Sequence, residues 1–215
     1  MSTNIGILLA AGHSSRFKGS DKQLYEINGK SIISFSIDLL SHNLDKLIII
    51  TNSTNVKKIS NLIDCDNVIL LVNDIDSRIK SIRTAVDHLS KEDVCNILIH
   101  DAARPFITQN HIDQLLIASK AHLYSQYYLN LVNGLAKRVE SGYEIVNRSD
   151  YIELCTPLIA DYKSYSDIFK RYVDVPESSI EVLPLLNSLN IPYKLIEGNH
   201  KHLRKITTLA DIYNS

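Results

Sequence analysis

The chain has 215 residues, which is long enough for one domain with a sizeable hydrophobic core. Hydrophobic residues make up 45% of it and charged residues 22%, a composition that excludes an intrinsically disordered chain. The formal net charge of −1 excludes a general electrostatic attraction to nucleic acid or to an anionic membrane, so phosphate binding would have to come from a local cluster of cations.

The first predicted element is a buried strand at residues 5–9, an apolar run typical of a parallel sheet. The Ala-Ala-Gly sequence at 10–12 follows it, and these small residues leave the backbone open to close approach by a ligand. Arg16 and Lys22 add two cations a few residues later. The combination predicts a polyphosphate-binding loop, whereas Ala-Ala-Gly alone would equally suit an ordinary strand-to-helix turn.

Two common phosphate-binding loops are absent from this region of the sequence. There is no Gly-x-x-x-x-Gly-Lys-Ser/Thr sequence here, which argues against a P-loop kinase or ATPase. Ser14 and Ser15 stand where a Gly-x-Gly-x-x-Gly sequence would need further glycines, which argues against a dinucleotide-binding loop. The sequence therefore indicates a phosphate loop of another kind.

Apolar runs alternate with helical periodicities over the rest of the first half of the chain. This order predicts right-handed crossovers, and so an α/β fold with a Rossmann-like, mostly parallel sheet and helices on both faces. Ligands of such sheets bind at the carboxyl ends of the strands, which is where the phosphate loop begins. Buried strands are predicted at 48–50, 68–72 and 96–99, and amphipathic helices at 31–40, 55–63, 77–89 and 109–123.

A second group of candidate residues, His-Asp-Ala-Ala-Arg-Pro-Phe at 100–106, follows the predicted strand at 96–99. Asp101 stands just past this strand and could hold Mg²⁺, which takes one or two carboxylates and fills its shell with phosphate oxygens and water. Arg104 could either brace Asp101 or bind a phosphate. The two dipeptides alone would also fit a structural Asp–Arg pair, but the complete sequence at this place in the sheet favours a metal and phosphate site.

The pattern changes in the second half of the chain. A strand at 127–131 precedes turn sequences at 133–134 and 141–142, and a hairpin is predicted around 139–146. This polar hairpin would bury little surface by itself, so we expect an arm at about 130–155 to pack against something else, with a second copy of the chain as a fair candidate. The remaining predicted elements are helices at about 160–171 and 177–189, a strand at 193–196, a solvated loop containing His200 and His202, and a short helix around Asp211.

Cysteine usage indicates the compartment. Cys65, Cys95 and Cys155 are odd in number and far apart, which favours reduced thiols in the cytoplasm over a disulfide framework or a zinc site. The first apolar run, at 5–11, is too short to span a bilayer and lacks the flanks of a secretory signal. We therefore expect a cytoplasmic protein that acts on small molecules, with no nucleic acid and no membrane among its partners.

Several of these segments resemble one enzyme family. Residues 10–17 and 21–23 resemble the signature loop of the nucleotidyltransferases that make nucleotide-activated sugars and polyols. The sequence at 100–106 resembles the second signature of the cytidylyltransferases that act on 2-C-methyl-D-erythritol 4-phosphate and on ribitol 5-phosphate, and it separates the chain from the molybdopterin nucleotidyltransferases, whose first loop is similar. The similarity continues at Arg78-x-x-Ser81, at Arg148 with Thr156-Pro157, and at Lys205-Ile206-Thr207 with Asp211.

The resemblance implies a single nucleotidyltransferase domain over residues 1–215, with a dimerisation β-arm at about 130–155 and hence a homodimer. It implies transfer of CMP from CTP to a polyol phosphate with release of pyrophosphate and with Mg²⁺ as cofactor. The expected acceptor is 2-C-methyl-D-erythritol 4-phosphate, in isoprenoid precursor synthesis. The alternatives are a ribitol-5-phosphate or other polyol- or sugar-phosphate cytidylyltransferase for surface-polymer synthesis, and a non-catalytic nucleotide-binding homologue.

The motifs and the resemblance together assign roles to individual residues. The predicted catalytic residues are Arg16, Lys22, Asp101 and Lys205, and Asp101 is the predicted metal ligand. The predicted nucleotide-binding residues are Ala10, Ala11, Gly12, Ser14, Asp74, Arg78, Ser81 and Ala102. The predicted acceptor-binding residues are Arg104, Thr207 and, from the arm of a second copy, Arg148.

Some positions depart from the family pattern. Asp74 and Ile75 stand where paired glycines are expected beside the base, and their side chains could reshape the base pocket. In the arm, Asn133 and Gly134 replace an Asp-Thr pair, which could remove a hydroxyl contact to the acceptor. The selection of cytosine and the choice of acceptor therefore stay open at the level of the sequence.

Overall fold

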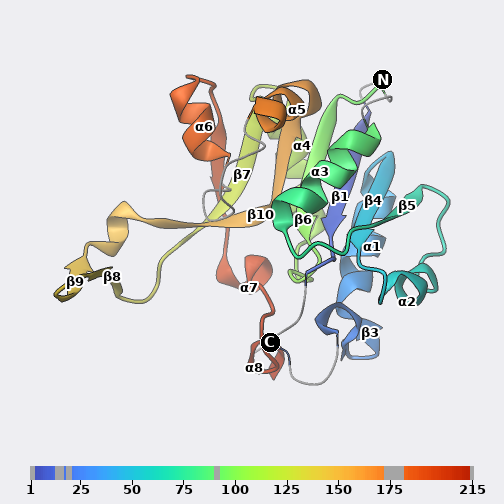
Figure 1. The fold of residues 1–215 in the computed structure, drawn as a ribbon, viewed down its shortest axis with the longest axis horizontal. Helices are drawn as coiled ribbons and strands as arrows, with labels where there is room; N and C mark the ends of the chain where they lie inside the picture. The colour runs from blue at the N-terminus through green and yellow to red at the C-terminus, as the bar shows by residue number, and fades with distance from the viewer. Residues whose placement is uncertain (1–2, 13–16, 18–20, 90–92, 172–181, 214–215) are drawn as a thin grey trace.

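The computed structural model describes residues 3–12, 17, 21–89, 93–171 and 182–213. Its central feature is a seven-stranded sheet in the order β11-β7-β10-β6-β1-β4-β5 (Figure 1). The strands of this sheet are β1 (Asn4–Leu9), β4 (Lys46–Thr51), β5 (Val68–Val72), β6 (Asn96–Asp101), β7 (Tyr124–Asn130), β10 (Ile152–Asp161) and β11 (Lys194–Glu197). Two short hairpins lie outside it and are formed by β2 (Glu26–Ile27) with β3 (Lys30–Ser31) and by β8 (Leu135–Val139) with β9 (Gly142–Val146).

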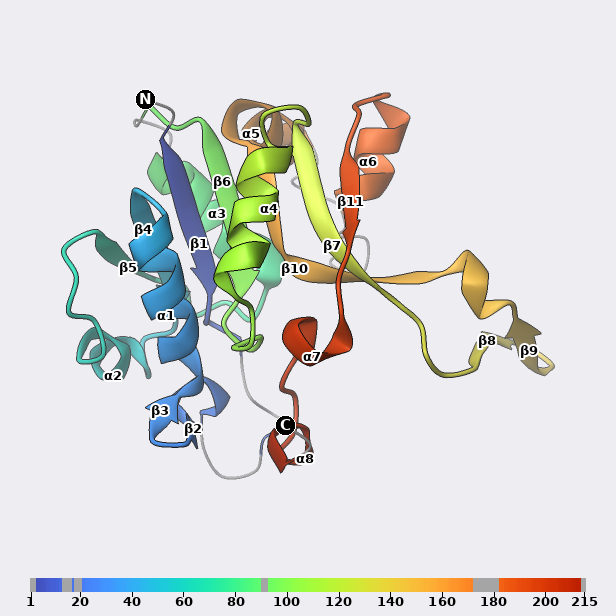
Figure 2. The ribbon, with the colours of Figure 1, turned by 180° about the vertical axis from the view of Figure 1, so that it is seen from behind.

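Helices cover both faces of the sheet. The helices of the described chain are α1 (Ile32–Asn43), α2 (Val56–Ser60), α3 (Arg78–Leu89), α4 (Gln109–Ala118), α5 (Tyr162–Arg171), α6 (Leu183–Ser188), α7 (His200–Leu203) and α8 (Ala210–Tyr213). One core lies under α1 and α4, and the other lies under α3, α5 and α6 (Figures 1 and 2). Among the described residues, no helix combines the length and the apolar composition that crossing a membrane would require.

The strands of the sheet are mostly parallel. β1 pairs in parallel with β4 and with β6, β4 pairs in parallel with β5, and β11 pairs in parallel with β7. Alternate side chains of β1 enter the two cores, with Ile5 and Ile7 on the α3 side and Leu8 on the α1 side, because successive residues of a strand point to opposite faces. The predicted α/β fold with a mostly parallel sheet between two helical layers is confirmed.

The antiparallel strand β10 was not expected from the sequence. It lies between β6 and β7 and occupies the segment just before and at the start of the predicted helix at about 160–171, so that α5 begins only at Tyr162. Pro157 in the middle of this strand lacks a donor N–H group, and for that reason proline is uncommon inside central strands. The register shifts between Cys155 and Leu158, and this irregularity accommodates the proline inside the sheet.

Other boundaries also differ from the sequence prediction. α4 ends at Ala118 and β7 already begins at Tyr124, so the predicted helix at 109–123 was too long. The predicted helix at 177–189 is present as α6, while residues 177–181 lie outside the described chain. The expected solvated loop at His200 and His202 is instead the short helix α7, in which both imidazoles bond to backbone carbonyls of other segments.

The predicted hairpin is confirmed as an arm formed by β8 and β9, which projects away from the main sheet (Figures 1 and 2). Its flanks are the end of β7 and the start of β10, which pair through Asn130 and Ile152. Tyr143 and Ile145 on the arm are 72% and 83% exposed. A two-stranded hairpin of this kind has almost no core of its own.

The C-terminal segment returns to the carboxyl edge of the sheet. Ile206 is fully buried in a small cluster with Phe17 and Ile32, and its N–H group donates to the carbonyl of Ala103 at 2.8 Å. The β2–β3 hairpin beside this cluster turns through Asn28 and Gly29, whose positive φ angles match an Asn-Gly turn. These contacts place Lys205, the residue before Ile206, next to the end of β6.

Candidate active site

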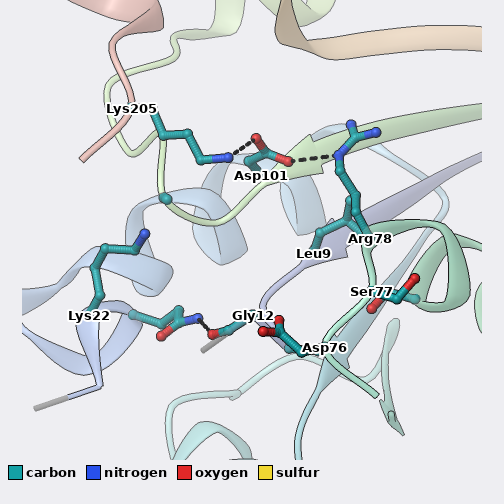
Figure 3. Close-up of a pocket in the computed structure, with 12 residues that line it drawn as sticks. Leu9, Gly12, Lys22, Asp76, Ser77, Arg78, Asp101 and Lys205 are labelled. Carbon is teal, nitrogen blue, oxygen red and sulfur yellow. Dashed lines mark hydrogen bonds and ion pairs between the residues drawn. The ribbon is translucent and has the colours of Figure 1, made fainter. Parts of the chain in front are cut away.

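A cavity of about 230 Å³ lies at the carboxyl ends of β1 and β6, beside the start of α3 (Figure 3). Leu9 and Asp101, the last residues of β1 and β6, are paired in the sheet, so both strands end at the same level. This is the edge at which ligands of parallel sheets bind. The residues that line the cavity are Leu9, Ala11, Gly12, Lys22, Gln23, Asp76, Ser77, Arg78, Ser81, Asp101, Ala103 and Lys205.

The cavity brings together segments that are far apart in the sequence. Of the residues assigned from the sequence, those in the lining are Ala11, Gly12, Lys22, Arg78, Ser81, Asp101 and Lys205. They come from the first loop, the start of α3, the end of β6 and the C-terminal segment. The shared cleft expected for Lys22 and Asp101 is present, while Ser14 and Arg16 lie outside the described residues.

Several other assigned residues do not line the cavity. Ala10 and Ala102 are buried behind it, and the carboxylate of Asp74 accepts the N–H group of Ser53 at 2.7 Å. Arg148 lies in the arm, where its guanidinium donates to the carbonyl of Val132. The hydroxyl of Thr207 donates to Asp211 at 2.8 Å.

Gln23 is the clearest functional residue to which the sequence analysis gave no role. It is 5% exposed, and its amide nitrogen donates to the carbonyls of Ala10 at 3.1 Å and Gly12 at 3.2 Å. These two bonds tie the start of the first loop to the turn that carries Lys22. The Lys-Gln pair at 22–23 was part of the motif that carries the resemblance, and that was the available signal. Leu9, Asp76, Ser77 and Ala103 were also missed, and each lies within two residues of an assigned residue in the sequence.

Asp101 is surrounded by three cations. Lys205 and Arg78 approach it from opposite sides (Figure 3), with Nζ of Lys205 2.9 Å from Oδ2 and Nε of Arg78 3.6 Å from Oδ1. Nε of Arg104 lies 3.7 Å from Oδ2. Burial by itself would raise the pKa of Asp101, but the charges of these three groups outweigh it and hold the pKa well below the usual range. The carboxylate is therefore ionised at any physiological pH.

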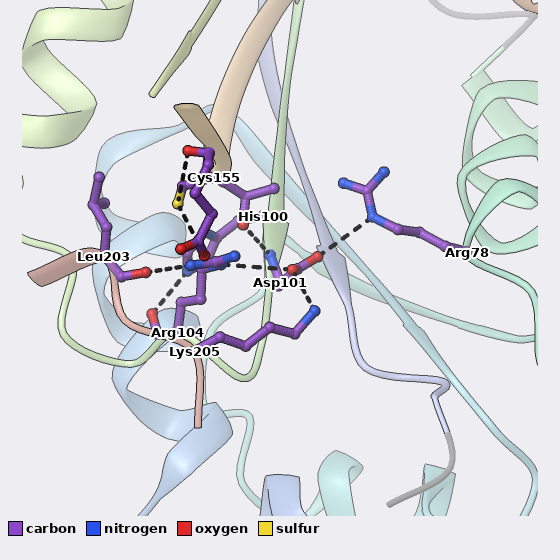
Figure 4. A network of polar contacts seen from close by, with 9 residues as sticks. Arg78, His100, Asp101, Arg104, Cys155, Leu203 and Lys205 are labelled. Carbon is purple, nitrogen blue, oxygen red and sulfur yellow. Dashed lines mark hydrogen bonds and ion pairs between the residues drawn. The ribbon is translucent and has the colours of Figure 1, made fainter. Parts of the chain in front are cut away.

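The Arg104 side chain is buried outside the cavity lining, with its guanidinium beside Asp101 (Figure 4). It is 7% exposed and donates to the carbonyl of Leu203, which links the end of β6 to the segment that carries Lys205. Of the two roles that the sequence left open for Arg104, bracing Asp101 is the one seen in the structure. The backbone N–H group of Asp101 donates to Oγ1 of Thr156 at 3.0 Å, so β10 fixes the backbone that carries this carboxylate.

Asp211 braces the segment on the other side of Lys205. Its carboxylate accepts the N–H groups of Thr207 and Thr208, both at 2.7 Å, and both of their hydroxyls. Although burial acts in the opposite direction, these bonds lower the pKa of Asp211 to about 2. The backbone that presents Lys205 is thus held at two points, by Arg104 before it and by Asp211 after it.

His100 makes the stability of this region sensitive to pH. It is fully buried and its Nε2 donates to the carbonyl of Arg104 at 3.0 Å, whereas its Nδ1 has no hydrogen-bond partner among the described residues. Burial lowers the pKa of His100 from 6.5 to about 4, so protonation favours the unfolded chain. The stabilisation is complete above the unfolded pKa near pH 6.5 and is lost as the pH falls toward 4. The free energy of unfolding should then drop by up to about 3 kcal/mol.

The variant His100→Gln tests this expectation. The glutamine stays neutral and can still donate to the Arg104 carbonyl, so its unfolding free energy should depend less steeply on pH between 7 and 5. Some dependence will remain, because burial and the charge of His202 also lower the pKa of His111. Chemical denaturation of both proteins at several pH values measures the two slopes, and equal slopes would contradict the assignment to His100.

The comparisons with known proteins agree with this geometry. A family model described as IspD, 2-C-methyl-D-erythritol 4-phosphate cytidylyltransferase, matches residues 5–215. The protein of that name from Dictyoglomus thermophilum is 28% identical over 221 residues, which cover 97% of this chain and 93% of the relative. The one from Thermotoga neapolitana is 24% identical over 199 residues, which cover 91% of this chain and 88% of the relative.

Solved structures show the same fold. The 4-diphosphocytidyl-2C-methyl-D-erythritol synthase of Anaerococcus prevotii is similar with a TM-score of 0.84 at 17% identity, over 99% of this chain and 94% of that one. The 2-C-methyl-D-erythritol 4-phosphate cytidylyltransferase of Francisella tularensis is similar with a TM-score of 0.79 at 19% identity, over 99% of this chain and 98% of that one.

Proposed function

Because the chain belongs to the 2-C-methyl-D-erythritol 4-phosphate cytidylyltransferase family, we propose that its cavity transfers CMP from CTP to 2-C-methyl-D-erythritol 4-phosphate. The observation that carries the proposal is the convergence of Lys22, Arg78 and Lys205 on one cavity at the carboxyl edge of the sheet. Three cations from three distant segments are complementary in sign to the phosphates of a triphosphate and of an acceptor.

The reaction needs positioning and charge neutralisation more than acid–base chemistry. A phosphate oxygen of the acceptor forms a bond to the α-phosphorus of CTP, the bond from that phosphorus to the bridging oxygen breaks, and pyrophosphate leaves with the electron pair. A phosphate monoester is already anionic at neutral pH, so no general base is required. Lys22, together with Arg16 as assigned from the sequence, would neutralise the charge that develops on the phosphates.

The base would lie at the other end of the cavity, beside the start of α3. Asp74 and Ile75, which replace the expected glycines, are both outside the lining, and Ile75 is 52% exposed. Asp76, Ser77 and Ser81 form this wall instead. A carboxylate such as Asp76 can accept a hydrogen bond from the exocyclic amine of cytosine, whereas uracil has a carbonyl oxygen at that position, so the wall favours CTP over UTP.

The residues present fit a Mg²⁺ ion that is shared with the nucleotide. In the described part of the chain no group of three or more His, Cys, Asp and Glu side chains could hold a metal, so a site made of protein ligands alone is not formed there. Mg²⁺ commonly uses one or two carboxylates plus substrate phosphates, and Asp101 provides such a carboxylate in the cavity. When bound, the metal would neutralise phosphate charge. Lys205 and Arg78, which contact Asp101 in this structure, would turn toward the phosphates.

The arm would complete the site of a second copy. Its exposed apolar side chains, including Tyr143 and Ile145, need a partner surface, and a homodimer provides one. In this arrangement Arg148 would reach the acceptor phosphate of the other subunit, which Lys205 would contact from its own side.

The acceptor assignment is tested by replacing Arg148 with alanine. We expect the KM for the acceptor to rise about tenfold or more, because a charged hydrogen bond to its phosphate is lost, while the KM for CTP changes little. Arg138→Ala is a matched control, since Arg138 lies on the same arm over the ring of Tyr143. Steady-state kinetics of pyrophosphate release measures both constants, and near-normal saturation by the acceptor would refute the role of Arg148.

The function itself is tested by following pyrophosphate release from CTP with a panel of acceptor phosphates. Turnover with 2-C-methyl-D-erythritol 4-phosphate is expected. Asn133 and Gly134 in the arm, where the family pattern has an Asp-Thr pair, keep ribitol 5-phosphate as the second candidate. Turnover of ribitol 5-phosphate alone would overturn the first choice. Binding of CTP without pyrophosphate release from any acceptor would instead indicate a non-catalytic homologue.

A further inference from the structure

A buried asparagine organises the loop that forms the base end of the cavity. Asn73 follows β5 directly and is 7% exposed, yet it does not line the cavity. Its side-chain oxygen accepts the N–H group of Ile75 at 3.2 Å, and its amide nitrogen donates to the hydroxyl of Ser81 at 3.0 Å and to the carbonyl of Ile75 at 3.4 Å. The backbone N–H group fixes which end of the amide is the oxygen, because it can only donate.

These bonds determine the course of the loop. An asparagine side chain that accepts the N–H group two residues later forms an Asx turn, and here it is followed by a bond from the N–H group of Ser77 to the carbonyl of Ile75 at 2.7 Å. The loop therefore turns at Ile75, whose side chain is 52% exposed and does not line the cavity. As a result Asp76 and Ser77 enter the lining without the two glycines that the family pattern has at 74–75.

The same side chain also holds the first turn of α3. Ser81 is 4% exposed and lines the cavity, and the Asn73 amide bonds to its hydroxyl oxygen. Asn73 thus joins the two parts of the wall, the loop at 74–77 and the helix that carries Arg78 and Ser81.

We propose that Asn73 is a positioning residue that sets the nucleotide affinity of this chain by shaping the base end of the cavity. The inference rests on the proposed function, because it takes the nucleotide in the cavity to be CTP. Asn73 acts through Asp76, Ser77 and Ser81 and contacts no reacting atom, so its loss should affect binding of CTP more than the chemical step.

The test compares Asn73→Ala and Asn73→Asp with the wild type. For Asn73→Ala we expect the Kd and KM for CTP to rise about tenfold and kcat to change by less than about threefold. Asn73→Asp keeps an acceptor for the Ile75 N–H group, so it should restore the CTP affinity to within about threefold of the wild type.

Asn67 offers a matched control at the opposite end of the same strand. It precedes β5, is half-buried, and its amide donates to the carbonyls of Ser41 at 2.8 Å and Leu44 at 3.3 Å, far from the cavity lining. Asn67→Ala should lower the melting temperature without changing the CTP constants. If Asn73→Ala behaved in the same way, or if Asn73→Asp were as impaired as Asn73→Ala, the proposal would be wrong.

The outcome can be separated from a failure of the proposed function. Calorimetric titration with CTP reports on Asn73 even where no acceptor is turned over. Absence of pyrophosphate release in the wild type would count against the reaction, whereas an unchanged CTP affinity in a folded Asn73→Ala protein would count against the positioning role alone.

Discussion

Replacing Lys22 with alanine is expected to lower the turnover number for CMP transfer by about a hundredfold or more, with a much smaller loss of CTP affinity. Lys22 lines the cavity beside Gly12, and the carbonyl of that glycine is held by Gln23. The backbone next to Lys22 is therefore tied to the first loop before the nucleotide arrives. Charge moves toward the leaving pyrophosphate only during the reaction, so a cation fixed at this place stabilises the transition state more than bound CTP.

Steady-state pyrophosphate release and CTP titration of Lys22→Ala separate these two quantities. Lys58→Ala is a suitable control, because Lys58 lies 3.9 Å from Asp21 near the same loop but outside the cavity lining. If Lys22→Ala kept a turnover number within about threefold of the wild type, the first loop would not be the phosphate site.

The substitution Asp101→Asn is expected to reduce turnover by a similar factor of about a hundred or more, but with the opposite effect on nucleotide binding. The amide has nearly the shape of the carboxylate and removes one negative charge from among Arg78, Arg104 and Lys205. A triphosphate then meets a more positive cavity, so CTP should bind more tightly when Mg²⁺ is absent. The carboxylate proposed to share the metal is lost, so added Mg²⁺ should stimulate the variant much less than the wild type.

Stability should also fall in this variant. Arg104 is nearly fully buried, and it loses the only carboxylate that contacts it among the described residues. An unpaired buried charge is costly, although the bond to the Leu203 carbonyl remains. Thermal melts measure the loss of stability, and CTP titrations with and without Mg²⁺ measure the nucleotide affinity and its response to the metal. Asp38→Asn, which removes the ion pair of this α1 residue with Lys30 of β3, is the control. An unchanged response to Mg²⁺ in Asp101→Asn would exclude the metal role.

The ion pairs around Asp101 hold its neighbouring cations in place before substrate arrives. Lys205 and Arg78 pair with the carboxylate in this structure, and the same two cations are the groups proposed to bind the phosphates. Binding of CTP would therefore exchange one set of ion pairs for another. Such an exchange costs less than exposing unpaired charges in a partly buried cavity.

Much of the fold follows from local patterns in the sequence. The apolar runs of β1, β4, β5 and β6 and the helical periodicities of α1 and α3 predict these elements near their observed positions, because buried strands and amphipathic helices have distinct spacings of apolar residues. β10 does not follow such a pattern. Pro157 and the polar residues near both ends of β10 interrupt the apolar run that would indicate a central strand. The strand is stabilised by pairing with β6 on one side and β7 on the other.

The residues in and around the cavity also divide into those that the sequence predicted and those that only the structure placed. The small residues at 10–12, the lysine of the first loop and the acid that ends β6 were recognisable from the sequence, because each has a chemistry and a place in a parallel sheet. The position of Arg104, buried beside Asp101, could not be recognised from the sequence. A guanidinium can bind either a carboxylate or a phosphate, and its burial in the fold decides which of the two it meets. The outward path of Asp74 and Ile75 also required the contacts of Asn73 with the rest of the loop.

The sequence alone therefore determined the class of the fold, the edge of the sheet where the cavity lies and the kinds of side chain found there. These depend on the spacing of apolar residues and on short motifs, and both act within one or two turns of the chain. Only the tertiary structure decided which charges meet. Lys205 lies 104 residues from Asp101 along the chain and 2.9 Å from it in space, a contact that depends on how α7 and the C-terminal segment pack against β6.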